Sequence, residues 1–229
     1  MKKATATILI ALICVALGIN AKEPLKISIL GDSYSTFEGC VTPETNAVWY
    51  FTTPKPDKTD LIDAEQTWWR ILLSDKQYQL EMNNSYSGST ICNTGYNNTD
   101  STPFSFITRM NNLGNPDLIL IFGATNDSWA NVPIGEWKWS DWTDEELKTF
   151  RPALAYMLEN LTKQYPTSKL LYIVNDGLKS EITSSIVEAC GRYAVPYIQL
   201  VDIDKTAGHP NINGMTQIAT QVATSLPRE

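Results

Sequence analysis

The sequence predicts an α/β domain, in which a five-stranded parallel sheet carries helices on both faces. The main observation is that short apolar runs typical of strands alternate five times with segments typical of helices. A second observation is the run 117–122, which is apolar without alternation, as expected of a strand covered on both faces. A third is that no repeat or low-complexity tract divides the chain, so we expect one domain.

The predicted strands are apolar runs bounded by turn-forming residues. They cover 25–30, 78–82, 117–122, 170–174 and 197–203. The first strand runs directly into Gly31-Asp32-Ser33, and the next two run into polar segments that hold Gly88 and Asn126. The last strand is followed by the single histidine, His209. Because the carboxyl ends of parallel strands meet at one edge of a sheet, where ligands bind, we expect these residues to form one site.

The predicted helices are recognised by their apolar faces and their start and stop residues. They cover 63–72, 103–113, 143–164, 179–193 and 211–226. Gly114-Asn115-Pro116 ends the second, and a capping box of Thr143 and Glu146 begins the third. Two connections are rich in aromatic residues: 39–60, which carries Trp49, and the one after 117–122, which carries Trp129. An irregular stretch as long as 39–60 is usually functional or partly disordered.

The first 21 residues are typical of a secretory signal peptide. Lys2 and Lys3 precede an apolar run over 8–17, and Ala21 is a small residue suited to cleavage. The run is shorter than the roughly 20 residues that span a membrane. We therefore expect export to the periplasm or the medium, removal of 1–21 and no stable membrane insertion afterwards. Residues 22–229 would form the folded domain.

Charge and cysteine content narrow the possible partners and cofactors. The formal net charge is −7 at pH 7, which argues against nucleic acid as a partner. Cys40, Cys92 and Cys190 lie beyond the signal peptide, and an odd number excludes a complete disulfide framework. Two interpretations stay open: a bridge between Cys40 and Cys92, or separate thiols with Cys190 buried in a helix. A single histidine argues against a structural zinc site.

The residues expected at the sheet edge suit acyl transfer. A nucleophilic serine needs a base within hydrogen-bonding reach, and His209 could serve Ser33 in this way. The N–H groups of Ser33 and Gly88 and the amide of Asn126 could stabilise an oxyanion. Each motif by itself is also typical of an ordinary turn, helix cap or surface histidine. Their occurrence at one predicted edge favours the catalytic interpretation.

With Gly31-Asp32-Ser33, Gly88, Thr125-Asn126-Asp127 and His209 in this order, the chain resembles the SGNH (GDSL-type) hydrolases over essentially all of its mature length. The resemblance implies a flavodoxin-like three-layer α/β/α sandwich without metal or cofactor. It also implies ester hydrolysis with Ser33 as nucleophile and His209 as base. The implied oxyanion hole consists of Ser33, Gly88 and Asn126.

Two positions depart from the family pattern. Ala124 stands where the third motif, Gly-x-Asn-Asp, has glycine, and its methyl group could crowd the loop that carries Asn126. Thr206 stands where Asp-x-x-His has its aspartate, so the carboxylate that orients the imidazole is missing from its usual place. Asp204 is the nearest substitute, Glu38 is another, and a backbone carbonyl would leave a Ser–His dyad. We expect either this dyad or a triad assisted by Asp204.

The aromatic connections indicate the substrate class. Trp49 and Trp129 follow strands that end at the active edge, and aromatic faces there suit sugar rings as well as acyl chains. Tryptophan with scattered Asn and Asp favours a glycan, and an exported, acidic chain of this kind resembles carbohydrate acetylesterases. The alternatives are a lysophospholipase or thioesterase of the same fold, tryptophans that only cap the core, and a catalytically weakened glycan-binding protein. Thr206 and Ala124 favour the last, whereas the retained Ser33 and His209 count against it.

Overall fold

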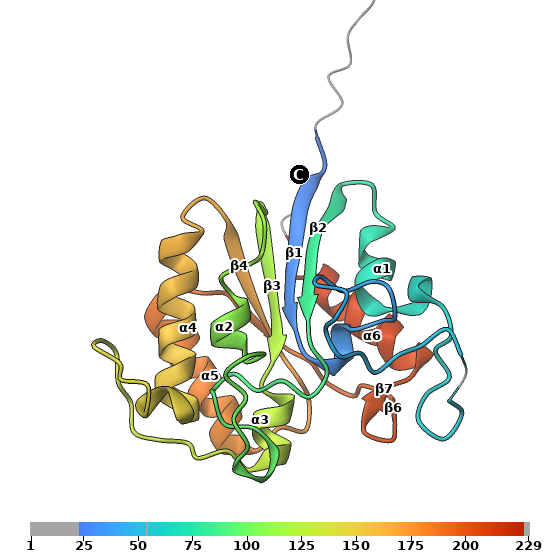
Figure 1. Ribbon diagram of the computed structural model, residues 1–229. Helices are drawn as coiled ribbons and strands as arrows, with labels where there is room; N and C mark the ends of the chain where they lie inside the picture. Colours follow the sequence, from blue (N-terminus) through green and yellow to red (C-terminus); the bar gives the residue numbers. More distant parts are fainter. Residues whose placement is uncertain (1–22, 54, 227–229) are drawn as a thin grey trace, which may run out of the picture.

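A computed structural model describes residues 23–53 and 55–226 (Figure 1). The predicted signal peptide, 1–21, lies outside these residues. No helix in the described part of the chain is both long and apolar enough to cross a membrane. The five strands are β1 (Leu25–Gly31), β2 (Tyr78–Ser85), β3 (Leu118–Gly123), β4 (Lys169–Val174) and β5 (Tyr197–Gln199).

All five strands are parallel and lie in the order β2-β1-β3-β4-β5. This is the flavodoxin-like order, and it confirms the predicted sheet. The chain moves outward from β1 to β2 and then returns past β1 to β3. The direction of winding therefore changes between β1 and β3, and a crevice forms at the carboxyl ends of these two strands.

Helices cover both faces of the sheet and produce the predicted three layers (Figure 1). One layer holds α1 (Trp68–Leu73) and α6 (Ile212–Ala223), and the other holds α2 (Phe106–Arg109), α4 (Phe150–Gln164) and α5 (Ser180–Tyr193). Side chains alternate between the layers along each strand. In β1, Ile27 and Ile29 pack with the α1 and α6 layer, and Leu30 packs with the other.

The third predicted helix begins later than its capping box suggests. Thr143 and Glu146 do form the reciprocal bonds of a capping box. That box begins only a short 3₁₀ turn, η4 (Glu146–Lys148). Thr149 then adopts an extended backbone, with φ −117° and ψ 150°, and α4 begins at the next residue. The predicted capping box therefore forms, but the long helix begins at Phe150, about two turns beyond the predicted start.

Other elements also differ from the predictions. The predicted helix 103–113 is reduced to α2, and the predicted helix 63–72 is divided into a 3₁₀ turn at 64–66 and α1. A short helix, α3 (Thr125–Ala130), replaces the beginning of the expected tryptophan-rich loop. The fifth strand ends at Gln199 rather than near 203, and the chain beyond it forms an antiparallel hairpin of β6 (Lys205–Thr206) and β7 (His209–Pro210). Three-residue 3₁₀ turns complete the list: η1 (Ser33–Ser35), η2 (Ala64–Gln66) and η3 (Tyr96–Asn98).

The three described cysteines are free thiols. Cys92 lies in the core on the α4 side of the sheet, whereas Cys40 packs against the core on the α6 side. The interpretation with a Cys40–Cys92 bridge is therefore wrong, because the sheet separates the two sulfur atoms. The alternative of separate thiols, with Cys190 buried in α5, agrees with the structure.

Candidate active site

Ser33 lies in a tight turn directly after β1. The Asp32 side chain caps this turn, since its Oδ1 accepts a hydrogen bond from the Tyr34 N–H at 3.0 Å. Gly31 allows the close packing that the turn requires: a Cβ atom there would lie 2.4 Å from Ser85 Oγ and 2.7 Å from Ser35 Cβ. The turn therefore places the Ser33 hydroxyl directly beyond the end of a central strand.

His209 reaches Ser33 from the hairpin of β6 and β7. Thr206 pairs with His209, and the two residues between them, Ala207 and Gly208, have φ of 48° and 77°. Positive φ at both central positions is the conformation of a type I′ turn. Gly208 is also the close-packed position of this turn, because a Cβ atom there would lie 3.2 Å from the Trp129 ring.

The imidazole and the hydroxyl form a direct contact. His209 Nε2 lies 3.0 Å from Ser33 Oγ, and His209 Nδ1 lies 3.2 Å from the Ala207 carbonyl oxygen. With the Nδ1–H donating to that carbonyl, Nε2 is unprotonated and accepts the hydrogen bond of the Ser33 hydroxyl. This is the arrangement of a nucleophile and its base.

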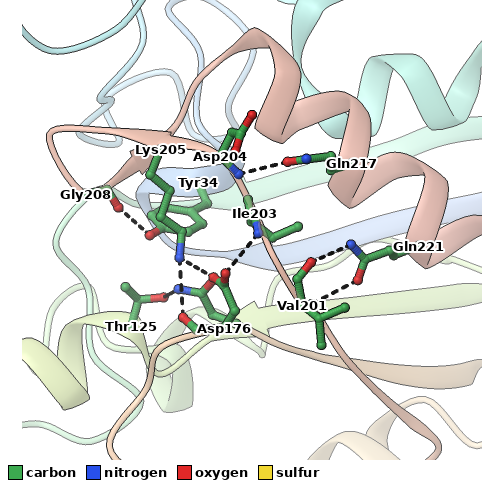
Figure 2. Close-up of polar contacts among 11 residues, drawn as sticks. Tyr34, Thr125, Asp176, Val201, Ile203, Asp204, Lys205, Gly208, Gln217 and Gln221 are labelled. Atoms are coloured by element: carbon green, nitrogen blue, oxygen red, sulfur yellow. Dashed lines mark hydrogen bonds and ion pairs between the residues drawn. The ribbon is translucent and has the colours of Figure 1, made fainter.

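Neither candidate carboxylate contacts His209 in the described part of the chain. The Asp204 side chain accepts a hydrogen bond from Asn213, while its N–H donates to Gln217 at 2.8 Å (Figure 2). Glu38 accepts hydrogen bonds from the backbone and side chain of Thr52. The structure therefore does not place the Asp204 carboxylate beside His209, because Asp204 lies just before the hairpin and its side chain is bonded to Asn213 in α6.

Long-range contacts hold the hairpin in place. Tyr34 donates a hydrogen bond to the Gly208 carbonyl at 2.5 Å (Figure 2), and Tyr50 donates one to the Pro210 carbonyl at 2.8 Å. At the base of the hairpin, Lys205 forms an ion pair with Asp176, whose carboxylate also accepts the N–H of Ile203 at 3.0 Å. The dyad is thus assembled by several parts of the chain.

Aromatic rings enclose the imidazole. Trp49 stacks on His209, with ring centroids 3.6 Å apart and planes inclined by 6°. Tyr34 and Trp129 approach the same ring at 5.3 Å and 5.5 Å. Burial lowers the pKa of His209 to about 4, while the Ala207 carbonyl opposes this shift and the positive charge of Lys205 adds to it. The imidazole is therefore neutral at pH 7, which is the state that can accept a proton.

Three donors face the crevice beside Ser33. The N–H groups of Ser33 and Gly88 have no hydrogen-bond partner within the described residues. Gly88 has a φ of 86°, which favours glycine at this position. The Asn126 Nδ2 group donates one hydrogen to the Ser89 carbonyl at 2.9 Å, which leaves its second hydrogen for a ligand.

An open pocket of about 380 Å³ joins these groups. It is lined by Ser33, Trp49, Ser87, Gly88, Tyr96, Asn126, Trp129, Ala207 and His209. The structure thus brings together every site residue expected from the sequence except Asp204. Larger hollows on the surface lie away from these residues. No group of three or more His, Cys, Asp and Glu in the described ranges could hold a metal ion.

The family departure at Ala124 has a structural consequence. Ala124 precedes α3 with a φ of 77°, a left-handed conformation that explains the family's preference for glycine. Its methyl group is fully buried in the core on the α4 side. The loop therefore accepts alanine at a cost of about 1–2 kcal/mol in backbone strain, and Asn126 still reaches the pocket.

Tyr96 and Asp127 hold the segments that carry Asn126 and Gly88. Asp127 belongs to the Thr125-Asn126-Asp127 motif, although its contact was not expected, whereas Tyr96 carried no sequence signal. The Tyr96 hydroxyl donates a hydrogen bond to Asn126 Oδ1 at 2.8 Å and so turns the amide nitrogen toward the pocket. Asp127 accepts the N–H of Ile91 at 2.9 Å, which anchors the segment after Gly88. Burial raises the pKa of Asp127 to about 7.

Arg109 is a buried charged residue that supports the site. This α2 residue donates hydrogen bonds to the carbonyls of Gly31 and Asn84 and to the Ser89 hydroxyl. It therefore ties the ends of β1 and β2 to the segment that contains Gly88. Burial lowers its pKa to about 9, so the guanidinium remains charged at pH 7. A lone arginine in a four-residue helix gives no hint of these contacts in the sequence.

Comparison with known proteins assigns the chain to a family. The family model for GDSL-like lipases and acylhydrolases matches residues 25–226. A candidate GDSL-like lipase from Bacteroides ovatus is 50% identical, with a TM-score of 0.87 over 89% of this chain and 98% of that one. A second, from Bacteroides uniformis, is 48% identical, with a TM-score of 0.86 over 89% and 95%.

More distant matches agree in fold alone. A carbohydrate esterase is 18% identical, with a TM-score of 0.63 over 91% of this chain and 70% of that one. No curated protein sequence matches the chain. The fold, the geometry of the crevice and the family match lead to one conclusion: this chain belongs to the GDSL-like lipase/acylhydrolase family and is an ester-hydrolysing enzyme.

Proposed function

We propose that the chain is an exported serine esterase that removes small acyl groups, above all O-acetyl groups, from carbohydrate. Ser33 is the nucleophile and His209 is the base. The observation that carries this assignment is the 3.0 Å contact between Ser33 Oγ and His209 Nε2, beside two backbone N–H groups that have no partner among the described residues. The proposed export depends on the signal-peptide pattern of residues 1–21.

The first half-reaction forms an acyl-enzyme. Ser33 Oγ attacks the ester carbonyl carbon while its proton moves to His209 Nε2, and the carbonyl π electrons move to oxygen. The oxyanion accepts hydrogen bonds from the N–H groups of Ser33 and Gly88 and from Asn126 Nδ2. The tetrahedral intermediate collapses as the C–O bond to the alcohol breaks. The departing alkoxide oxygen takes the proton from Nε2.

The second half-reaction repeats these steps with water. His209 Nε2 accepts a proton from water, whose oxygen attacks the acyl carbon, and the same three donors hold the oxyanion. When the intermediate collapses, Ser33 Oγ leaves with the proton from Nε2, and the carboxylic acid is released. The Ala207 carbonyl holds the Nδ1–H throughout, so the ring keeps the tautomer that this cycle needs.

The pocket walls favour a small acyl group on a sugar. Among the residues that line it in the described chain, none has a long aliphatic side chain, whereas a fatty acyl chain is best held by such residues. Trp129 and Tyr96 are 41% and 39% exposed at the pocket, where their rings are available to a carbohydrate. A carbohydrate esterase also occurs among proteins of the same fold.

The proposal is tested by hydrolysis of p-nitrophenyl acetate and p-nitrophenyl octanoate with residues 22–229 and the Ser33→Ala variant. We expect acetate release that depends on Ser33, with little cleavage of octanoate, followed by acetate release from an acetylated polysaccharide. A preference for octanoate would instead indicate a lysophospholipase or thioesterase. Equal rates for both proteins would contradict the catalytic assignment and favour a glycan-binding protein, because a carbonyl, not a carboxylate, faces His209 Nδ1.

A further inference from the structure

The stacking of Trp49 on His209 is the closest ring contact of the site. The indole and imidazole planes are nearly parallel, 6° apart, and their centroids are separated by 3.6 Å. The Lys58 ammonium lies over the same indole, 5.4 Å from its centroid. One face of Trp49 is therefore covered by the imidazole, so this face is not available to a sugar.

The backbone of Trp49 is attached to the nucleophile turn. Its N–H donates a hydrogen bond to Thr36 Oγ1 at 2.9 Å, and that hydroxyl donates to the Ser33 carbonyl at 2.9 Å. Thr36 is fully buried. Ser33 therefore contacts Thr36, Thr36 contacts Trp49, and Trp49 contacts His209, which in turn contacts Ser33. The position of the indole is set relative to the same turn that carries the nucleophile.

A Ser–His pair without a carboxylate lacks two contributions. In a triad the carboxylate orients the imidazole, and its charge stabilises the imidazolium that forms during proton transfer. Here the Ala207 carbonyl holds the tautomer, but it carries no full charge. An indole face contributes in both respects, because parallel stacking limits rotation of the imidazole and the ring quadrupole attracts a cation.

We propose that Trp49 is a positioning residue for His209. Its indole replaces the missing carboxylate in two respects: it orients the imidazole and it stabilises the imidazolium. This inference rests on the proposed function. As the Ser33 Oγ–H bond breaks and the Nε2–H bond forms, positive charge appears on the imidazole directly beneath the indole face. A desolvated cation–π contact of this kind corresponds to about tenfold in rate.

Trp129 provides the matched comparison. It approaches the same imidazole at 5.5 Å, but its ring is inclined by 70° and it is 41% exposed. An edge contact does not hold the imidazole plane in the way that parallel stacking does. Trp129 therefore serves the substrate side of the pocket and Trp49 serves the base.

The kinetic test compares Trp49→Phe, Trp49→Leu and, as a control outside the pocket, Trp139→Leu, with p-nitrophenyl acetate as substrate. We expect Trp49→Leu to lower kcat about tenfold with KM changed less than about twofold, and Trp49→Phe to stay within about threefold of the parent. Trp139→Leu removes a tryptophan that stacks on Trp137 and does not line the pocket, so it should leave kcat for this ester within about twofold. Equal losses for Trp49→Phe and Trp49→Leu, or a normal kcat for Trp49→Leu, would overturn the proposal.

A spectroscopic test detects the stacking of Trp49 on His209 independently of catalytic activity. The chain has one histidine, so untagged protein gives one set of imidazole proton signals. In the Ser33→Ala background, the current of a stacked aromatic ring should shift these signals upfield, and Trp49→Phe should keep most of that shift. Trp49→Leu should lose it, whereas Trp129→Leu should retain most of it. Unchanged signals in Trp49→Leu would show that the stack does not form in solution.

The two proposals fail in different ways. If the parent and Ser33→Ala hydrolyse the ester equally, the proposed function fails, whatever the imidazole signals show. If hydrolysis depends on Ser33 and Trp49→Leu has the kcat of the parent, only the role of Trp49 fails. A folded Trp49→Leu variant is verified by near-ultraviolet circular dichroism, and Trp49→Phe tests the same contact with less disturbance of packing.

Discussion

The two halves of the dyad are held in place by different means. Ser33 depends on its neighbours in the sequence: β1 delivers it, the Asp32 side chain caps its turn and Thr36 closes the turn by bonding the Ser33 carbonyl. His209 depends on distant residues. The Tyr34 and Tyr50 hydroxyls bind its hairpin from positions 174 and 160 residues away from the carbonyls that they contact.

This contrast shows which half of the site is more easily disturbed. The Ser33 turn directly follows a central strand and is held by the hydrogen bonds of the sheet. We therefore expect the turn to keep its conformation as long as the sheet is folded. The hairpin of β6 and β7 has only two residues in each strand and pairs with no strand of the main sheet. Its position therefore depends on side-chain anchors, and changes at those anchors should affect catalysis more than overall folding.

The largest expected effect concerns the protonation of the base. His209 must be neutral to accept a proton, and burial among aromatic rings lowers its pKa to about 4. We therefore expect kcat/KM to persist at pH 4.5, where a histidine of ordinary pKa would be only about 1% neutral. The acid limb should have its midpoint near 4, because activity is lost as the pH falls through the pKa of the folded-state imidazole.

The measurement is a pH profile of kcat/KM together with an NMR titration of the single histidine. Asp32 is a control for the assignment, because burial raises its pKa to about 6. A kinetic midpoint near 6 with an imidazole that titrates near 4 would point to Asp32. An imidazole that titrates near 6.5 would refute the closed environment described for His209.

A smaller effect is expected from the tyrosine that joins the two halves. Tyr34 belongs to the Ser33 turn, and its hydroxyl binds the Gly208 carbonyl. Tyr34→Phe removes this bond, so we expect kcat to fall about tenfold through misplacement of His209. The free energy of unfolding should fall by about 1 kcal/mol. Tyr197→Phe, on the exposed strand β5, is the matched control. Loss of folding in Tyr34→Phe, measured by thermal denaturation, would contradict the view that the hairpin is a separate, locally anchored unit.

The smallest effect is expected at Asp204. Its carboxylate is engaged by Asn213 and not by His209, so Asp204→Asn should leave kcat within about twofold of the parent. A loss approaching the roughly 10⁴-fold seen when a triad carboxylate is removed would restore Asp204 to the catalytic site. Steady-state kinetics at pH 7, with Asn213→Ala in parallel, separates a catalytic effect from a disturbance of the start of α6.

The sequence by itself determined the sheet, the order of the helices and the residues that meet at its edge. These features depend on short-range patterns: apolar runs for strands, caps for helices, and Gly31-Asp32-Ser33 directly after a strand. Parallel topology then brings Ser33, Gly88 and Asn126 to one edge, so their meeting could be inferred without coordinates. The approach of His209 followed from the same argument, although the hairpin that carries it did not.

Only the tertiary structure decided what surrounds the dyad. The carbonyl at His209 Nδ1 depends on positive φ at Ala207 and Gly208, and no sequence pattern distinguished it from Asp204. The stacking of Trp49 and the burial of Arg109 join segments that lie far apart in the chain. Such contacts arise from the packing of the whole domain, and a tryptophan or an arginine has many possible partners until that packing selects one.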